Sequence, residues 1–254
     1  PAQTSSDYPQ KLFSPLIYTG NGASSRSITG LGFQPDWVWL KNRDANTGQK
    51  LFDSTRGVNK ALYSHNTDAE STISGVSAFG SDGFSLGPQV TGYNDNTNKF
   101  VAWNWRSNGG TTVSNSNGDI TSTVQTDPSG HFSIVKYTGN NNSWENPATV
   151  GHGLNSAPDC ILLKALGAVD QWECFFSDYG TTSTGGATAA NASLALNTDA
   201  ALYTSQTYKT WGGVMPTSSV FTVDGNNANG TETEGIIAYC FANIEGFIKV
   251  GSYV

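Results

Sequence analysis

The sequence predicts an all-β fold, with two tandem antiparallel β-sandwich or jelly-roll domains. Short runs of alternating apolar and polar residues recur along the chain, and turn-forming Gly, Pro, Asn and Asp separate them. Helical periodicity of any length is missing. The sequence also repeats itself in order, which indicates two copies of one strand-rich unit.

The repeat is clearest at the first predicted strand, where FSPLIYTGNG (13–22) returns as FSIVKYTGNN (132–141). Five further matches follow in the same order. They pair QPDWVWLK (34–41) with APDCILLK (157–164), LFDSTRG (51–57) with CFFSDYG (174–180), NTDA (66–69) with NTDA (197–200), SDGFSLG (81–87) with SSVFTVDG (218–225), and FVAWNW (100–105) with IIAYCF (236–241). The spacing between matches drifts, so we expect loop insertions in the second copy.

This repeat divides the chain into five predicted segments. They are a polar lead-in (1–12), the first sandwich (13–106), a linker of turn-forming residues without a continuous apolar face (107–130), the second sandwich (131–242), and the first strand of a third copy (243–254). Because the chain starts at Pro1 and ends on a strand-like segment, we expect it to be part of a longer repetitive polypeptide.

Seven segments of the first copy have the alternation of strands: 14–18, 27–29, 37–42, 50–53, 61–64, 83–86 and 99–105. A Pro-Asp pair precedes a strand in both copies, at Pro35-Asp36 and Pro158-Asp159. Proline fixes φ in such a turn, and we expect the Asp carboxylate to accept a backbone N–H.

The composition argues against several classes of function. A net charge of −7 disfavours binding to a nucleic-acid backbone or to an anionic bilayer. No apolar run approaches the ~20 residues of a membrane-spanning helix. The three cysteines, Cys160, Cys174 and Cys240, have no metal-ligand spacing. We expect buried free thiols, with a Cys160–Cys240 or Cys174–Cys240 disulfide as the alternative.

Aromatic residues are the candidate binding groups. Trp37 with Trp39, and Trp103 with Trp105, each share one face of a strand, as in a sugar-stacking platform. Their counterparts in the second copy are Cys160, Leu162, Tyr239 and Phe241, and such apolar exchange favours a core role. The aromatics in loops of the second copy are the stronger candidates for ligand binding. They are Trp144, Trp172, Tyr203, Tyr208 and Trp211, the last three within an insertion at 203–216.

Catalytic and metal motifs are sparse, so we predict that the protein is not an enzyme. No nucleophile elbow, HExxH motif or P-loop occurs. We expect no cofactor. Calcium is the alternative, since oxygen-rich turns occur at 94–98, 115–119 and 224–229.

The strings YTGNG, GLGFQPDWVWLKNR, LFDSTRG, SDGFSLG and FVAWNW, followed by SNGDITSTV and a new GHFSIVKYTGN, resemble the tandem concanavalin A-like, laminin-G-like β-sandwich repeats of tailed, often marine, bacteriophage virion proteins. The resemblance implies an extracellular virion structural protein of the tail-fibre or capsid-fibre type. Its domains would attach to the host surface through glycans, and its partners would be other virion proteins and further copies of itself. The alternatives are a purely architectural spacer and a polysaccharide depolymerase.

Overall fold

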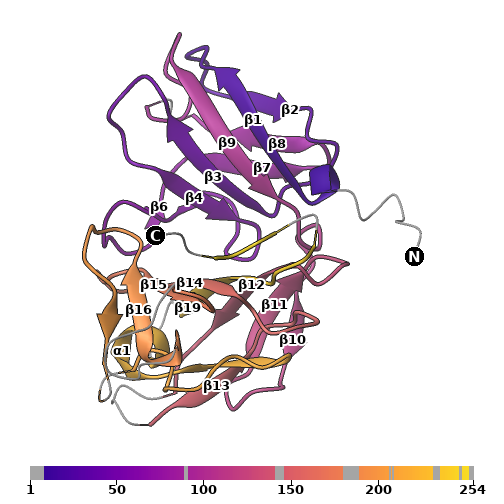
Figure 1. Ribbon diagram of the computed structural model, residues 1–254. Helices are drawn as coiled ribbons and strands as arrows, with labels where there is room; N and C mark the ends of the chain where they lie inside the picture. The colour runs from indigo at the N-terminus through magenta and orange to yellow at the C-terminus, as the bar shows by residue number, and fades with distance from the viewer. Residues whose placement is uncertain are drawn as a thin grey trace. The chain divides into compact units, whose positions relative to one another are not determined.

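The computed structural model describes residues 9–88, 91–140, 146–179, 189–205, 207, 209–230, 235–245 and 248–251 (Figure 1). As predicted, the regular structure is nearly all β, in antiparallel sheets. Among the described residues, helices are limited to η1 (Pro9–Lys11), η2 (Ala189–Asn191) and α1 (Gly225–Asn229), and none of them is long and apolar enough to cross a membrane. The chain forms two compact units, Pro1–His65 with Glu70–Thr111 and Asn66–Ala69 with Thr112–Val254.

The first unit contains two main sheets. One has the order β1 (Phe13–Thr19), β9 (Lys99–Trp105), β3 (Trp37–Asn42) and β4 (Lys50–Asp53). The other has the order β2 (Arg26–Thr29), β8 (Gly83–Leu86) and β7 (Val76–Gly80), and a short pair joins β5 (Lys60–Ala61) to β6 (Ser71–Thr72). Side chains of both main sheets form the hydrophobic core, among them Ile28, Val38, Leu40, Phe84, Leu86 and Ala102.

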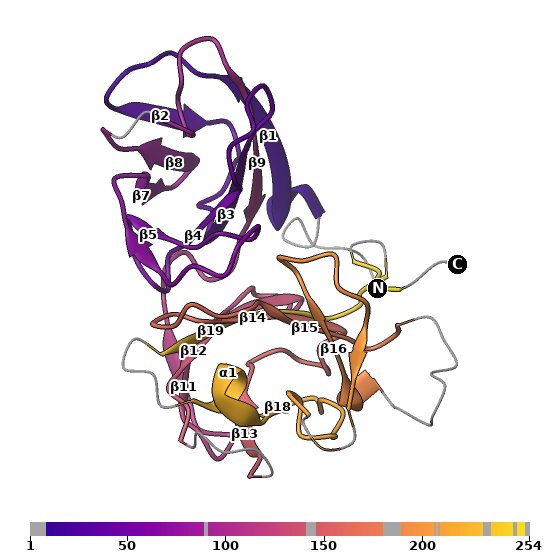
Figure 2. The same ribbon diagram turned by 90° about the vertical axis from the view of Figure 1, so that its left-hand side faces the viewer.

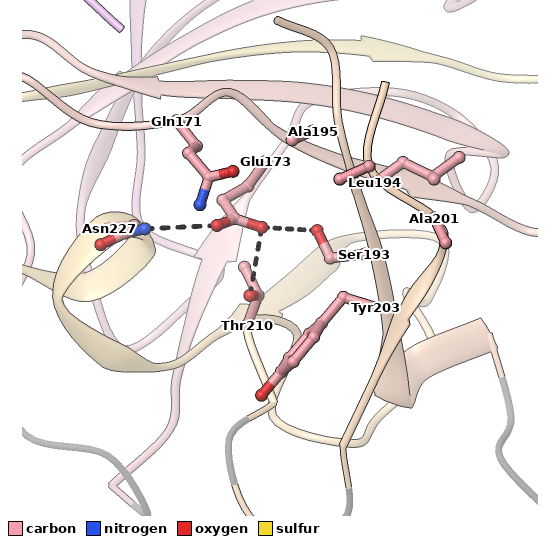
Figure 3. Close-up of a pocket in the computed structure, with 10 residues that line it drawn as sticks. Gln171, Glu173, Ser193, Leu194, Ala195, Ala201, Tyr203, Thr210 and Asn227 are labelled. Atoms are coloured by element: carbon pink, nitrogen blue, oxygen red, sulfur yellow. Dashed lines mark hydrogen bonds between the residues drawn. The ribbon is translucent and has the colours of Figure 1, made fainter. Parts of the chain in front are cut away.

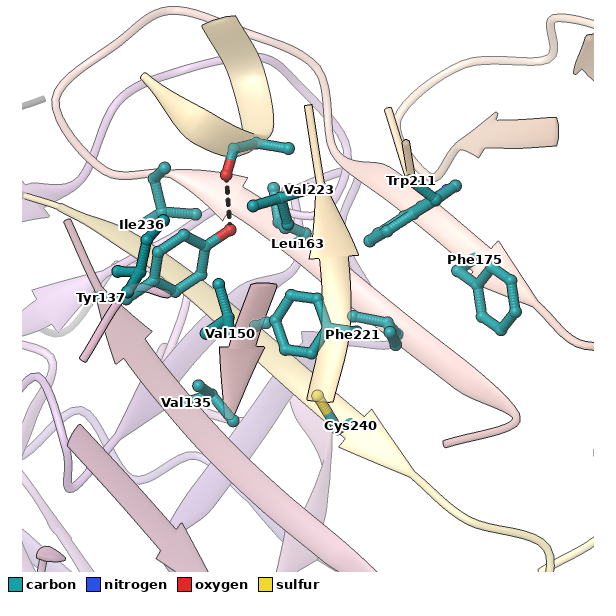
Figure 4. Packing of buried hydrophobic residues seen from close by; sticks show 14 of the residues in the cluster. Val135, Tyr137, Val150, Leu163, Phe175, Trp211, Phe221, Val223, Ile236 and Cys240 are labelled. Carbon is teal, nitrogen blue, oxygen red and sulfur yellow. Dashed lines mark hydrogen bonds between the residues drawn. The ribbon is translucent and has the colours of Figure 1, made fainter. Parts of the chain in front are cut away.

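The second unit contains one long sheet and one strand pair. The long sheet has the order β10 (Val113–Asn115), β11 (Ser122–Thr126), β12 (Phe132–Tyr137), β19 (Ile236–Phe241), β14 (Cys160–Ala165), β15 (Glu173–Phe176), β16 (Ala192–Ala195) and β17 (Tyr203–Thr204). The pair β13 (Ala148–Gly151) and β18 (Val220–Val223) lies opposite its middle strands (Figure 2). The core between them includes Val135, Tyr137, Val150, Leu163, Phe175, Trp211, Phe221 and Cys240 (Figure 4).

The order β1-β9-β3-β4 of the first unit recurs in the second as β12-β19-β14-β15. The hydrogen bonds recur as well. Tyr18 donates its hydroxyl to the Tyr93 carbonyl at 2.7 Å, and Tyr137 donates to the Ala228 carbonyl at 2.7 Å. In the turn that follows, Asn21 N–H donates to Asn94 Oδ1 and Asn140 N–H to Asn229 Oδ1, both at 3.1 Å. The sequence matches therefore reflect equivalent local structure.

The Pro-Asp pairs have the structural role that the sequence predicts. The buried Asp36 carboxylate accepts hydrogen bonds from the backbone N–H groups of Ser107, Gly109 and Gly110, at 2.7–2.9 Å, and from the Ser54 hydroxyl. In the second unit, the Asp159 carboxylate accepts the Asn243 N–H at 2.8 Å and the Ser177 hydroxyl at 2.6 Å. Each carboxylate thus fixes the chain where it leaves the last strand of its unit.

Most predicted strands of the first copy lie within a residue or two of the observed ones. β3, β4, β8 and β9 have the predicted bounds, whereas only Ala61 of the segment 61–64 belongs to a strand. β6 and β7 were not predicted. Ser, Thr and Gly are so frequent in these two strands that the apolar alternation is weak.

The segment 107–130, predicted as a linker, differs in the structure. It contains β10 and β11, and β11 pairs with β12 along its length, from Ser122 opposite Tyr137 to Thr126 opposite Ser133. Val124 and Gln125 are buried, and Ile120 contributes to the core. The apolar residues of 107–130 are too few for a continuous apolar face. Pairing of β11 with the buried strand β12 also stabilises the segment.

The sequence predicts a core role for the paired tryptophans, but they do not belong to the core between the two sheets. Val38 and Leu40 occupy the core face of β3, so Trp37 and Trp39 project from the opposite face. There the rings pack on one another, with centroids 4.3 Å apart for Trp37–Trp105 and 6.2 Å for Trp39–Trp103. Trp37 is fully buried and the other three are half-buried. Both faces of β3 are apolar, so alternation alone does not identify the inner one.

The three cysteines are buried free thiols, as predicted. The Cys240 side chain lies in the core, whereas the side chains of Cys160 and Cys174 are on the opposite face of the sheet. Side chains on opposite faces cannot form a disulfide without backbone movement, which excludes both bridges to Cys240.

The segment 243–254, predicted as the first strand of a third copy, is described only in part. Ile244 and Ile248 pair through reciprocal backbone hydrogen bonds of 2.9 and 3.0 Å. The third copy remains a prediction.

Candidate functional site

The candidate site is a pocket at one end of the core in the second unit. It has a volume of about 500 Å³, within the roughly 300–1,000 Å³ that is typical of small-molecule sites. β15, β16, β17, α1 and the segments beside them supply its walls. The lining residues are Gln171, Glu173, Ser193, Leu194, Ala195, Ala200, Ala201, Tyr203, Thr210 and Asn227 (Figure 3).

Glu173 is the central polar group of the pocket. Its Oε2 accepts hydrogen bonds from the Ser193 hydroxyl at 2.5 Å and from the Thr210 hydroxyl at 3.3 Å. Its Oε1 accepts a hydrogen bond from the Asn227 amide at 3.2 Å (Figure 3). Three neutral donors from three different segments therefore fix the carboxylate in place.

The remaining walls combine apolar surface with one aromatic ring. Leu194, Ala195, Ala200 and Ala201 line the pocket, and Tyr203 beside them is 54 % exposed. Figure 3 shows the Tyr203 ring along the side of the pocket near Thr210. A carboxylate and an exposed ring next to small apolar side chains suit a ligand that has polar groups on one side and a flat apolar face on the other.

Strand pairing brings these residues together. Glu173 is opposite Ala195 in the β15–β16 pair, and Ser193 is opposite Tyr203 in the β16–β17 pair. Since alternate residues point to one side of a sheet, Glu173 lies on the same face as Phe175, whose ring belongs to the core. The pocket therefore begins where the core ends.

Thr210 is positioned by its neighbour Trp211 and by β18. The Trp211 ring is 1 % exposed and packs edge-on against Phe175, with ring centroids 5.7 Å apart (Figure 4). The Thr210 carbonyl accepts the Asp224 N–H at 2.8 Å. With its main chain held in this way, the Thr210 hydroxyl reaches the Glu173 carboxylate.

The structure corrects two of the five aromatic residues predicted to bind ligand. Trp211 is a core residue, and Trp172 is fully buried and stacks on Tyr239 with ring centroids 6.4 Å apart. Their polar neighbours in sequence indicated exposed loops, but both rings are buried. Tyr203 lines the pocket, while Trp144 and Tyr208 lie outside the described residues.

Sequence reasoning did not identify Glu173, although the repeat contains a signal for it. Strand register makes Lys50 its counterpart, since Trp37 is opposite Asp53 and Cys160 is opposite Phe176. The Lys50 ammonium lies 4.7 Å from the centre of the Tyr93 ring, and burial lowers the pKa of Lys50. The charge at this position of the duplicated strand therefore has opposite signs in the two copies.

The oxygen-rich turns considered for calcium have hydrogen-bonded side chains. Asn94 and Asn229 hold equivalent turns, and Asp119 accepts both the N–H and the hydroxyl of Thr149. In the described part of the chain, no group of three or more His, Cys, Asp or Glu side chains is arranged to hold a metal ion. The pocket borders one of these turns through Asn227.

The comparison with protein families gives one match, which covers both units. A family model described as a domain of unknown function (DUF7483) matches residues 6–254. The chain belongs to the DUF7483 family. Neither the curated proteins nor the solved structures include a match to this DUF7483 chain.

Proposed function

We propose that this DUF7483 chain is a structural module of a tailed-bacteriophage virion, of the tail-fibre or capsid-fibre type, that attaches to host-surface glycans. Its two units would be tandem jelly-roll sandwiches of the concanavalin A-like kind. The sequence resemblance and the recurrence of strand order and turn hydrogen bonds in the two units support this proposal. The further partners would be other virion proteins and copies of the same chain, as in an extracellular fibre.

The observation that supports glycan binding is the pocket around Glu173. Sugars present hydroxyl donors on their edges and apolar C–H groups on their faces. The Glu173 carboxylate is an acceptor for hydroxyl groups, and the exposed Tyr203 ring offers a face for stacking. Both groups lie on one rigid sheet, so binding orders few additional residues.

The pocket supports binding more strongly than hydrolysis. A glycosidase uses a pair of carboxylates on either side of the scissile bond, roughly 5–10 Å apart. Among the ten described lining residues, Glu173 is the one carboxylate, and three neutral donors hold it. We therefore propose a binding site without catalytic activity.

A purely architectural role is the second candidate, and the outer face of the β1-β9-β3-β4 sheet favours it. Trp39, Trp103 and Trp105 are half-buried there, and Ile17 on the edge strand β1 is 69 % exposed. Aromatic and aliphatic surface of this kind is typical of contacts between protein chains. In a spacer, such contacts would be the function and the Glu173 pocket would stay unused.

The test is a titration of the purified chain with hexoses, followed by calorimetry or ligand-observed NMR. We expect binding that Tyr203→Ala weakens roughly tenfold, equivalent to about 1.4 kcal/mol. Val113→Ala is the matched control, because Val113 is a similarly exposed residue of an edge strand, 56 % against 54 %. Equal binding by the wild type and Tyr203→Ala, or no binding of any hexose to the folded chain, would contradict the proposal.

A further inference from the structure

We propose that the Glu173 pocket selects a sugar that carries a free, positively charged amine. The ligand class is an amino sugar without an N-acetyl group. This inference rests on the proposed function, in which the pocket binds glycans, and it specifies the chemical group that is recognised.

The first argument is charge. The ten described lining residues include the Glu173 carboxylate and no Lys, Arg or His. The hydrogen-bond donors to this carboxylate are a Ser hydroxyl, a Thr hydroxyl and an Asn amide, all neutral. No ion pair found among the described residues involves Glu173. The pocket thus keeps a net negative charge, which an ammonium group complements and a neutral hydroxyl does not.

The second argument is the number of acceptor positions. An ionised carboxylate offers about four lone-pair sites. The Ser193 and Thr210 hydroxyls occupy two sites on Oε2, and the Asn227 amide occupies one on Oε1. With respect to the described residues, one site therefore remains for a ligand donor. Gln171 lines the same side of the pocket beside Glu173, and rotation of its side-chain amide would present the oxygen to a second N–H of the ammonium (Figure 3).

The third argument is the aromatic ring. Tyr203 is 54 % exposed and lines the pocket with Glu173 and Thr210. A cation close to an aromatic face is attracted by the ring's electrons, and this attraction adds to the charge pairing. The first unit has such a contact at the equivalent strand position, where the Lys50 ammonium lies 4.7 Å from the Tyr93 ring centre. In the second unit, Glu173 replaces that lysine, and the ligand supplies the cation.

The experiment compares glucosamine, N-acetylglucosamine and glucose on the wild-type chain by calorimetry, near pH 6 and at low salt. We expect glucosamine to bind about tenfold tighter than the other two, because a charge-assisted hydrogen bond replaces a neutral one. Added salt should reduce this advantage, since screening weakens charge pairing at a partly exposed site. The comparison needs no variant, so it does not depend on the folding of a mutant.

Variants then assign the effect to Glu173. Glu173→Gln should remove the preference for glucosamine, and Glu173→Lys, which restores the charge of Lys50, should abolish glucosamine binding. Asp119→Asn is the matched control, because it removes one negative charge from an exposed position of the same unit outside the pocket. It should leave the preference unchanged.

Three results would overturn the inference. Equal affinities for the three sugars, with Tyr203 still required, would overturn it and leave the proposed function in place. A preference for glucosamine that persists in folded Glu173→Gln would assign the amine to another site. Failure of all three sugars to bind the folded wild type would overturn this inference, and the proposed function would fall with it if no other hexose bound either.

Discussion

At the scale of residues, Trp211 and Thr210 are neighbours in the sequence and contribute to the pocket differently. Trp211 is in the core, and its burial fixes the segment that presents the Thr210 hydroxyl to Glu173. The Trp211 ring thus affects the site indirectly, by positioning Thr210, whereas Tyr203 would contact the ligand itself.

Replacing Trp211 with alanine should therefore destabilise the second unit. Loss of a fully buried Trp costs roughly 3–5 kcal/mol, because a cavity remains in the core. Urea denaturation followed by fluorescence measures the change. Tyr203→Ala is the control and should change stability by less than about 0.5 kcal/mol, as expected for an exposed side chain. A loss below about 1 kcal/mol in Trp211→Ala would place the ring outside the core.

His152 predicts how stability depends on pH. It is fully buried, and the Leu154 N–H donates to its Nδ1, so Nε2 carries the proton and donates to the Thr217 carbonyl at 3.1 Å. Burial lowers the pKa of His152 below the usual value near 6.5. Below pH 6.5, His152 is protonated more readily in the unfolded chain than in the folded chain. The stability that neutral His152 contributes to the folded state is therefore fully present above pH 6.5 and is lost as the pH falls.

The measurement is the free energy of unfolding between pH 7.5 and pH 5 for the wild type and His152→Gln. We expect the wild type to lose more stability over this range, because the variant lacks the titrating group. Parallel pH profiles for the two proteins would show that His152 does not contribute.

The residues of the site were only partly predictable. Tyr203 was identified because it is an aromatic residue in an insertion of the second copy, and recognition usually occurs on loops of a rigid sandwich. Trp172 and Trp211 have equally polar neighbours, yet both are buried, since the direction of a side chain in a loop depends on tertiary packing. Glu173 was missed because it looks like an ordinary polar residue at the start of a strand. Comparison with Lys50 in the first copy distinguishes it.

At the scale of elements, β10 and β11 extend the sheet of the second unit beyond the repeated strands. β11 pairs with β12 and leaves β10 as the edge. In the first unit, the equivalent strand β1 is at the end of its sheet. The two copies therefore differ at the same sheet edge.

This difference predicts how fragments of the second unit behave. A fragment of residues 112–254 should fold, whereas a fragment of residues 131–254 should self-associate. The shorter fragment lacks β11, so the backbone hydrogen-bonding groups of β12 become exposed. The core residues that pack against Val124 also become exposed. Sedimentation and circular dichroism distinguish the two. A monomeric, equally stable 131–254 fragment would show that 107–130 is a dispensable linker.

The strands themselves were predicted well and their faces were not. In β3, Trp37 and Trp39 alternate with Val38 and Leu40, so both faces are apolar. The alternation therefore does not show which face points into the core. The structure assigns the aliphatic face to the core. Such assignments depend on which residues the opposing sheet presents, which a single strand does not encode.

At the scale of the whole molecule, the two units share one architecture but differ at the first residue of an equivalent strand. This residue is Lys50 in β4 and Glu173 in β15. The same strand order and the same turn hydrogen bonds are present in both units. The first unit fills the position with Lys50 over Tyr93, and the second opens a pocket at Glu173. The two units thus share a scaffold and differ at this position, where the second unit has a pocket.

The most direct test of this account is a crystal structure of the chain soaked with glucosamine. The account predicts one sugar in the second unit, with its amine within hydrogen-bond distance of the Glu173 carboxylate and its ring against Tyr203. It also predicts no sugar at Lys50 of the first unit. An accessible pocket that stays empty while glucosamine binds elsewhere on the chain would contradict the account.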